Sequence, residues 1–283
     1  MGTELYSYKL KQEVVRYLLV IARIARSSYY YTLKQLERPY PYKEAKELIS
    51  SIFNQHKGRY GYRRMTQALK ERGVWSNHKV VSRIMKELGL VCKVRQQRYR
   101  SYRGEAGKKA PNLLNREFKA EAPNQKWVTD VTEFKIGGRK LYLSTIMDLY
   151  NGEIISFQAA ESPNLSLVID MLRKALNRLP DNSKLMLHSD QGWQYRHVSY
   201  CGLLKKHGIT QSMSRKGNCY DNAVIENFFD HLKSEFLYLE EFEDMETLKN
   251  ELEEYMAYHN KFRIKMKLNG LSPVQYRLQN QAA

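Results

Sequence analysis

Cysteine is scarce in this chain, and long apolar runs are missing from it. The 283 residues include 3 cysteines, none of them in a C-x-x-C pair, and three cannot all pair with one another. This argues against a disulfide-stapled secreted domain and fits a reducing cytoplasm. The cysteines and the 7 histidines also lack zinc-finger spacing. No apolar run reaches the ~18 residues of a membrane span, and the first residues lack the apolar stretch of a secretory signal. We therefore expect a cytoplasmic protein with no membrane partner.

Negative charge is scarce in the first half of the chain. Overall, 47 Lys and Arg stand against 30 Asp and Glu, a net charge of +17. Residues 1–126 hold 28 basic and 10 acidic side chains, whereas residues 127–283 hold 19 and 20. A basic excess suits a polyanion such as nucleic acid. General solubility charge is the alternative, but it would not segregate so sharply. One part is expected to hold phosphate backbones and the other to concentrate carboxylates.

The first half is expected to be helical. Apolar residues recur at helical spacing over 8–25, 43–55, 62–72 and 78–88. Two short helices joined by a brief turn, the second of them basic, are typical of helix-turn-helix DNA binding. A small helical bundle with a solvated basic face is the alternative. The first interpretation predicts DNA contacts at Arg63, Arg64, Lys79, Arg83 and Lys86.

A basic segment over 92–122 follows, and it is interpreted as a linker. Its basic residues are interleaved with Tyr99 and Tyr102, and such a segment can follow phosphates and stack on bases. A plain solvated tether is the alternative, and both can hold. Three further DNA contacts are predicted here, at Arg95, Arg98 and Arg100.

From residue 126 on, the pattern changes. Strands are expected over 127–136, 139–150, 153–160, 184–190 and 208–213, and helices over 165–179, 199–207, 221–237 and 244–260. Three hairpin-connected strands followed by alternating helix and strand define a mixed α/β sheet, and their order matches an RNase H-like arrangement. The expected domains are a helical segment at 1–40, a helix-turn-helix domain at 41–91, the linker at 92–122, and an RNase H-like core with a C-terminal helical extension at 123–283.

Three carboxylates in this core are interpreted as one metal-binding cluster. Asp130 lies on the first strand, Asp190 ends an apolar strand, and Glu226 lies in a helix, with 35 residues between Asp190 and Glu226. A carboxylate that follows KLMLH would be costly to bury without a metal or a cationic partner. Two divalent ions about 4 Å apart can activate the attacking oxygen and stabilise the leaving oxygen of a phosphodiester. Mg²⁺ prefers such oxygen ligands.

Each carboxylate has an ordinary structural alternative. Asp130 can cap a turn, Asp190 can close an Asx-turn, and Glu226 can be a solvated helix residue. Asp148, at the end of its strand, is a rival ligand, whereas alternation puts Glu133 on the opposite face from Asp130. DNA contacts are also predicted around this cluster, in the loop SRKGN and on the face of the Glu226 helix. They are Arg215, Lys216, Asn222 and Lys233, and Lys233 can equally be solvated.

Several sequence motifs together resemble those of a known family. They are HKGRYGYRRM (56–65), NLLNREF (112–118), PNQKWVTDVT (123–132), HSDQG (188–192), SRKGNCYDNAVIENFF (214–229) and GLSPVQYR (270–277). The chain resembles the orfB-type transposases of the insertion sequence three family, whose DDE catalytic core is shared with retroviral integrases. The resemblance implies that Asp130, Asp190 and Glu226 are the catalytic triad and that they bind Mg²⁺ (or Mn²⁺), two ions in each site.

The resemblance also implies a substrate and partners. The protein would cleave and transfer strands of double-stranded DNA at the ends of a bacterial insertion sequence, bound there as a homo-oligomer and associated with the nucleoid. Frameshifting commonly fuses such a chain to an upstream product. Two positions depart from the family pattern, because Asp230 stands where glycine is usual and Gly152 where arginine is frequent. A simple metal nuclease and a DNA-binding regulator derived from a transposase are the alternative functions.

Overall fold

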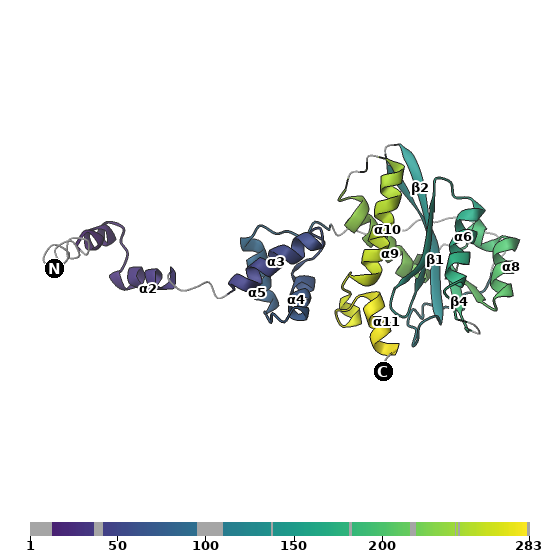
Figure 1. Ribbon diagram of the computed structural model, residues 1–283, viewed down its shortest axis with the longest axis horizontal. Helices are drawn as coiled ribbons and strands as arrows, with labels where there is room; N and C mark the ends of the chain where they lie inside the picture. The colour runs from purple at the N-terminus through teal and green to yellow at the C-terminus, as the bar shows by residue number, and fades with distance from the viewer. Residues whose placement is uncertain are drawn as a thin grey trace.

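The computed structural model describes residues 13–36, 42–94, 110–136, 138–180, 183–215, 219–240, 242 and 244–281. In Figure 1, a helical stretch at 13–21 and helix α2 (Arg26–Leu36) stand apart from a three-helix unit, which lies beside a larger α/β part. No helix in these ranges is long and apolar enough to cross a membrane. The domain boundaries given above stay a prediction.

The three-helix unit consists of α3 (Lys43–Gln55), α4 (Tyr62–Glu71) and α5 (His78–Glu87). Each helix has an apolar stripe, and the stripes meet in a core that includes Ile49, Leu69 and Ile84. The Asn77 side chain accepts a hydrogen bond from the Lys79 N–H and so caps α5. The helices expected over 43–55, 62–72 and 78–88 are confirmed.

The α/β part is built on one five-stranded sheet. Its strands are β1 (Lys126–Ile136), β2 (Arg139–Asp148), β3 (Ile154–Ala160), β4 (Met186–Ser189) and β5 (Thr210–Met213). They lie in the order β3-β2-β1-β4-β5, with β1, β2 and β3 antiparallel and β4 and β5 parallel to β1. This confirms the mixed sheet that the hairpin pattern predicts.

Helices cover both faces of the sheet (Figure 1). On one face lie α6 (Leu165–Leu176), the short α7 (Trp193–Arg196) and α8 (Val198–Lys206), and on the other lie α9 (Ala223–Leu232) and α10 (Met245–Lys261). The helix expected over 221–237 is divided into a 3-10 turn, η1 (Cys219–Asp221), then α9, then a π-helical turn, η2 (Lys233–Leu237). Another 3-10 turn, η3 (Met266–Leu268), and helix α11 (Pro273–Gln281) complete the chain that is described.

Alternation along β1 decides which residues meet which helices. Trp127 packs with the α6 and α8 cluster, whereas Val128 and Phe134 pack with α9 and α10. Because successive side chains of a strand point to opposite faces, Asp130 shares the face of Val128. The first strand therefore presents Asp130 toward the helix that carries Glu226.

Candidate active site

Asp130 and Asp190 occupy neighbouring positions on adjacent strands. β1 pairs with β4 in parallel register, with Val128 opposite His188 and Thr129 opposite Ser189, so the next residue of each segment is an aspartate, Asp130 within β1 and Asp190 directly after the end of β4. Neighbouring strands lie about 4.8 Å apart. One carboxylate oxygen of Asp130 accepts the Val131 N–H at 2.8 Å, and one of Asp190 accepts the Gly192 N–H at 2.8 Å. The sheet therefore brings these two predicted residues together.

Helix α9 brings the third carboxylate to the same face. Ile225 and Phe228 pack into the cluster that contains Val128, and the half-buried Glu226 lies between them on the helix. Burial, then the charge of Asp190 and then that of Glu226, raises the pKa of Asp130 well above its usual range, while Lys233 acts in the opposite direction. Asp130 therefore lies near enough to Asp190 and Glu226 to be repelled by both.

The carboxylates do not form a closed ligand set as they stand. In the described ranges, no group of three or more His, Cys, Asp or Glu side chains is gathered tightly enough to hold an ion. The two aspartates instead each direct an oxygen to a nearby backbone N–H. Burial also raises the pKa of Asp190, against the Gly192 N–H and the charge of Arg196. Partly buried like charges of this kind are expected to favour a bound cation.

Two buried polar side chains on elements next to this cluster have polar atoms without partners. Within the described structure, the Tyr195 hydroxyl and both polar atoms of the Asn222 amide are buried and lack a hydrogen bond. Burial first, and then the charges of Asp130 and Asp190, raise the pKa of Tyr195 well above its usual range, which places its hydroxyl near both aspartates. Asn222 immediately precedes α9, and its buried amide is not on the outer surface where a DNA contact is expected.

Asp221 ties the surrounding loops together. Its side chain is fully buried and accepts hydrogen bonds from Arg215 Nε at 2.9 Å, Arg116 Nε at 2.9 Å and Asn112 Nδ2 at 2.8 Å. The hydrogen bond from the Arg215 side chain lowers the pKa of Asp221 most. Burial acts in the opposite direction, but hydrogen bonds from the Arg215 N–H and the Arg116 side chain add to the lowering, so the pKa of Asp221 lies well below its usual range. Arg215 remains about half exposed. The motif NLLNREF is thus bound, through Asp221, to the loop that carries Arg215.

His188 begins the motif HSDQG, but the sequence assigns no role to it. Its Nδ1 lies 2.8 Å from Ser212 Oγ and its Nε2 lies 3.1 Å from Ser214 Oγ, so the ring links β4 to β5 just before Asp190. Burial lowers the pKa of His188 to about 4. The imidazole is therefore neutral at pH 7 and acts here as a hydrogen-bonding support rather than as a charge.

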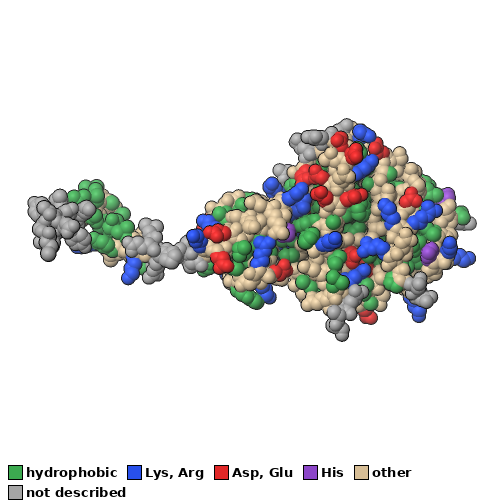
Figure 2. Space-filling model, in the orientation of Figure 1, with side chains coloured by type: hydrophobic (Ala, Val, Ile, Leu, Met, Phe, Trp, Pro, Cys, Tyr) green, Lys and Arg blue, Asp and Glu red, His purple; other side chains and the backbone are tan. Residues whose placement is uncertain are grey.

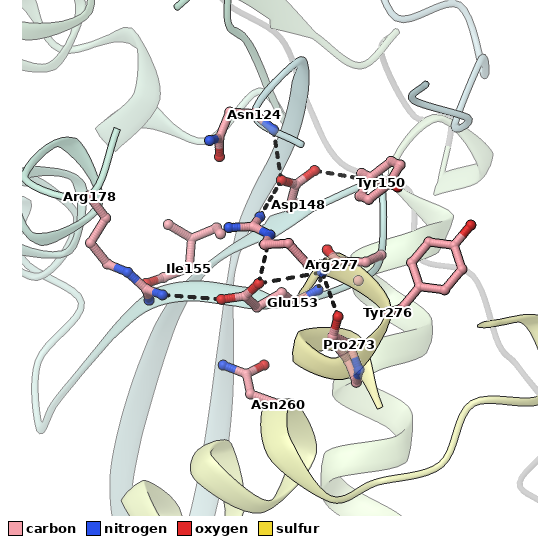
Figure 3. A network of polar contacts seen from close by, with 12 residues as sticks. Asn124, Asp148, Tyr150, Glu153, Ile155, Arg178, Asn260, Pro273, Tyr276 and Arg277 are labelled. Carbon is pink, nitrogen blue, oxygen red and sulfur yellow. Dashed lines mark hydrogen bonds and ion pairs between the residues drawn. The ribbon is translucent and has the colours of Figure 1, made fainter. Parts of the chain in front are cut away.

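Asp148, the rival ligand, is committed to another network (Figure 3). Its carboxylate accepts the N–H groups of Asn124 and Tyr150, each at 2.9 Å, and pairs with Arg277 Nη2 of α11 at 2.8 Å. Arg277 Nε also lies 3.1 Å from Glu153, which itself pairs with Arg178 at 3.1 Å. Through Arg277, the motif GLSPVQYR is therefore bound to the end of β2. The contacts give Asp148 a structural role.

The two departures from the family pattern lie in different surroundings. Gly152 has a φ of +70°, and its carbonyl accepts a hydrogen bond from the Lys265 ammonium at 3.0 Å. A side chain at this position would collide with that ammonium, so a lysine from elsewhere in the chain fills the space beside Gly152. Asp230 is exposed on α9 and borders a cavity between α9 and the three-helix unit.

The predicted DNA contacts of the first half divide into two groups. Lys79, Arg83 and Lys86 are exposed on α5, and Arg63 is exposed on α4. Arg64, in contrast, is partly buried and lies 3.2 Å from Glu235. The remaining predicted contacts at Arg95, Arg98, Arg100 and Lys216 lie outside the described residues, and Lys233 is partly buried.

Comparisons with known proteins extend these observations. Family models match three stretches of the chain, namely an HTH-like domain at residues 41–98 and an integrase core domain at residues 120–219 and 226–280. Among solved structures, the HTLV-2 integrase catalytic core domain in complex with magnesium (trimeric form) is similar at 17% identity and a TM-score of 0.44. It covers 56% of this chain and 98% of that one, a similarity too weak to support an inference about chemistry.

Relatives in sequence are much closer. InsK of insertion sequence element IS150 from Escherichia coli (strain K12) is 53% identical over 93% of this chain and 93% of its own. The transposase for insertion sequence element IS904 from Lactococcus lactis subsp. lactis (strain IL1403) is 35% identical over 83% of this chain and 93% of its own. The transposase InsF for insertion sequence IS3A from Escherichia coli (strain K12) is 33% identical over 93% of both. The chain therefore belongs to the IS3 family of insertion-sequence transposases, with an integrase core domain and an HTH-like domain.

Proposed function

We propose that this transposase cleaves and transfers DNA strands at the ends of its element, and that Asp130, Asp190 and Glu226 carry the reaction by binding divalent cations. The observation that supports this most is the parallel register of β1 and β4. It makes neighbours of Asp130 and Asp190 on the sheet face where α9 carries Glu226. Repulsion of Asp130 by the two other carboxylates at the edge of an apolar core is unfavourable alone, which is the arrangement expected of residues that share cations.

The donor set fits Mg²⁺ or Mn²⁺, two ions in each site. These hard cations prefer carboxylate oxygens, and Asp130, Asp190 and Glu226 would hold them. When bound, such ions activate the attacking oxygen of a DNA 3′-hydroxyl and stabilise the leaving oxygen. The unpartnered Tyr195 hydroxyl and Asn222 amide are buried polar groups that can orient the carboxylates. Lys233 lowers the pKa of Asp130 and so favours its ionised, ligating form.

DNA is expected to approach along basic surfaces of both parts. An HTH-like domain in a transposase implies DNA binding, and we assign Lys79, Arg83 and Lys86 of α5 to the element end. Arg215, held by Asp221 yet about half exposed, is assigned to a phosphate near the reacting bond. Chromosomal DNA as the substrate would place the protein in the bacterial cytoplasm, on the nucleoid.

A homo-oligomer on the paired ends, and an upstream product fused in frame, are the proposed protein partners. The large apolar side chains of residues 13–24 are mostly exposed, Tyr17 and Ile21 among them. This exposure supports the proposal that a protein partner binds this part of the chain. Hydrophobic side chains gather over this stretch in Figure 2. Contiguous apolar surface of this kind marks an interaction site.

The test is a joining assay with labelled, pre-cleaved element-end DNA, a second DNA and Mg²⁺. Glu226→Gln removes one charge with little change of shape, and we expect joining to fall at least ~100-fold, as when a group acting on the reacting atoms is lost. Asp230→Asn is the matched control, because it removes a charge from the exposed side of the same helix. Equal activity of Glu226→Gln and the parent protein would refute the proposed triad. In a parallel reaction with uncleaved end DNA, cleavage without joining would indicate a nuclease, and DNA binding with neither would indicate a regulator.

A further inference from the structure

The three-helix unit is fastened to the α/β part through a joint formed by residues 56–67 on one side and 235–270 on the other. Arg59 Nε donates to the Glu235 carbonyl at 2.8 Å, and the Tyr60 hydroxyl donates to the Phe262 carbonyl at 3.1 Å. The same hydroxyl accepts the Ile264 N–H at 3.1 Å, and the Ile264 side chain enters the core of the three-helix unit. The motif HKGRYGYRRM therefore serves mainly to bind the three-helix unit to the α/β part.

Glu235 is the centre of this joint. Its side chain is 2% exposed, and its two oxygens accept hydrogen bonds from Arg263 at 2.7 and 2.6 Å and from the Tyr255 hydroxyl at 3.2 Å. Arg64 of α4 reaches the same carboxylate at 3.2 Å. Burial alone would raise the pKa of Glu235, but the hydrogen bonds and charge of Arg263 and the charge of Arg64 lower it to about 2. The carboxylate is thus ionised and pairs with an arginine from each part.

The joint acts on the helix that carries the proposed catalytic glutamate. Glu235 lies on η2, which continues α9 without a break, and Glu226 lies two to three turns earlier. Lys233, on the same π-helical turn, acts electrostatically on Asp130. Single π-helical turns within α-helices are often found at functional sites. One helix therefore carries Glu226 and Lys233 beside the carboxylate cluster and Glu235 beside Arg64.

Neighbouring arginines of α4 differ in what they contact. Arg64 pairs with Glu235, whereas Arg63 is exposed and its Nε is bonded to the adjacent Tyr62 hydroxyl at 3.2 Å. Both border a cavity of about 750 Å³ that also touches Asn227 and Asp230 of α9. The exposed basic side chains of α5 form no bond in the joint. The DNA-reading face of the unit is thus left open while the unit itself is held in place.

We propose that Glu235 is a positioning residue, which through Arg64 fixes the helix-turn-helix unit to the helix that carries Glu226. A buried, hydrogen-bonded charge pair defines one orientation more strictly than apolar contact does. If the proposed strand transfer is correct, on which this inference rests, the joint sets the distance along the DNA between the sequence that α5 reads and the bond that is joined. Arg64 then belongs to the joint and Arg63 to the DNA surface.

Four variants separate these roles. Arg64→Gln, alone and combined with Arg59→Gln, weakens the joint from the side of the three-helix unit and leaves the Glu235–Arg263 pair in the core intact. Arg63→Gln removes an equal charge one residue away and is the matched control. Small-angle scattering of the full chain without DNA is expected to show a larger radius of gyration for the double variant and no change for Arg63→Gln. Arg64→Lys, which restores the charge, is expected to recover part of the compact form.

The functional readout is joining of end DNAs that carry one to five inserted base pairs between the recognised sequence and the 3′ end. Each base pair adds about 3.4 Å, and the parent protein is expected to lose at least ~10-fold in joining at the unfavourable spacings, as misplaced reacting groups do. The double variant is expected to be less active at the native spacing but nearly indifferent to the insertions. A double variant that keeps both the scattering profile and the spacing dependence of the parent would overturn the inference. Parent protein that joins no DNA would refute the proposed strand transfer instead, and scattering would still decide whether Arg64 closes the joint.

Discussion

Replacing Arg277 by glutamine is expected to loosen the hold of α11 on the catalytic sheet. Arg277 lies 2.8 Å from Asp148 and 3.1 Å from Glu153, and the side chains of both acids are almost completely buried. After the replacement, Asp148 keeps the N–H groups of Asn124 and Tyr150, and Glu153 keeps Arg178. The change therefore removes one charge-assisted hydrogen bond and one ion pair, but it leaves neither acid without a partner.

The expected loss follows from these contacts. Breaking a buried pair by removing one partner costs about 3–5 kcal/mol, and the remaining partners favour the low end, about 3 kcal/mol. At ~2–4 °C per kcal/mol for a chain of this size, the Tm should fall by roughly 6–12 °C. Burial already raises the pKa of Asp148, and Arg277 is one of the groups that lower it. Without Arg277 that pKa rises further. When the pKa of an acid is higher in the folded than in the unfolded protein, the folded protein loses stability as the pH rises between the two values. The stability loss of Arg277→Gln relative to the parent protein should therefore shrink from pH 7 toward pH 4.

Thermal and urea unfolding of the full chain, followed by circular dichroism at pH 7 and near pH 4.5, measure this loss. Arg173→Gln is the control, because its pair with Asp170 at 3.3 Å is exposed on both sides and should contribute no more than ~1 kcal/mol. The reasoning fails if Arg277→Gln costs no more than the control. A loss of stability that is the same at both pH values would refute the predicted rise in the pKa of Asp148.

Three further outcomes can be measured. Lys79→Ala should weaken DNA binding and reduce the slope of log K against log salt by about one; filter binding at several salt concentrations checks this, and an unchanged slope would remove α5 from the DNA surface. His188→Asn should make the unfolding free energy less dependent on pH between 6.5 and 4, because folded His188 stays neutral down to about 4 while unfolded histidine binds a proton near 6.5; urea titrations at pH 7 and 5 test it, and equal pH dependence would contradict it. Gly152→Ala should destabilise more than Gly138→Ala, since both have positive φ but only Gly152 faces the Lys265 ammonium; equal Tm losses would show that this contact yields freely.

The sheet was the part of the fold most open to prediction. Successive side chains of a strand point to opposite faces, and this alone puts Asp130 on the face of Val128 and Phe134 and Glu133 on the other. The hairpin order and the later helix–strand alternation leave few ways to arrange five strands. The register between β1 and β4 was beyond the sequence, because it depends on packing between segments far apart in the chain. That register is what makes neighbours of Asp130 and Asp190.

The contacts that the sequence did not reveal all join distant segments. Arg64 looks like any other arginine of a basic helix until Glu235, 171 residues later, is found beside it. The helix expected over 221–237 contains a π-helical turn, on which the buried Glu235 pairs with Arg263, and helical periodicity predicts neither feature. Helix α11 has too few apolar residues for a helical stripe, and it is held by Arg277 instead. The tertiary partner, not local propensity, decides each of these cases.

The parallel pairing of β1 with β4 also bears on the moment in synthesis at which the carboxylates meet. β1, β2 and β3 follow one another through short hairpins and can form as soon as they leave the ribosome. β4 joins β1 only after α6, and Glu226 follows later still. Long-range parallel pairing is slow, because the loop must close before its contacts stabilise it. A growing or truncated chain therefore displays Asp130 on a hairpin without its neighbours. The nascent protein should therefore lack the proposed strand-transfer activity until most of the core has been made.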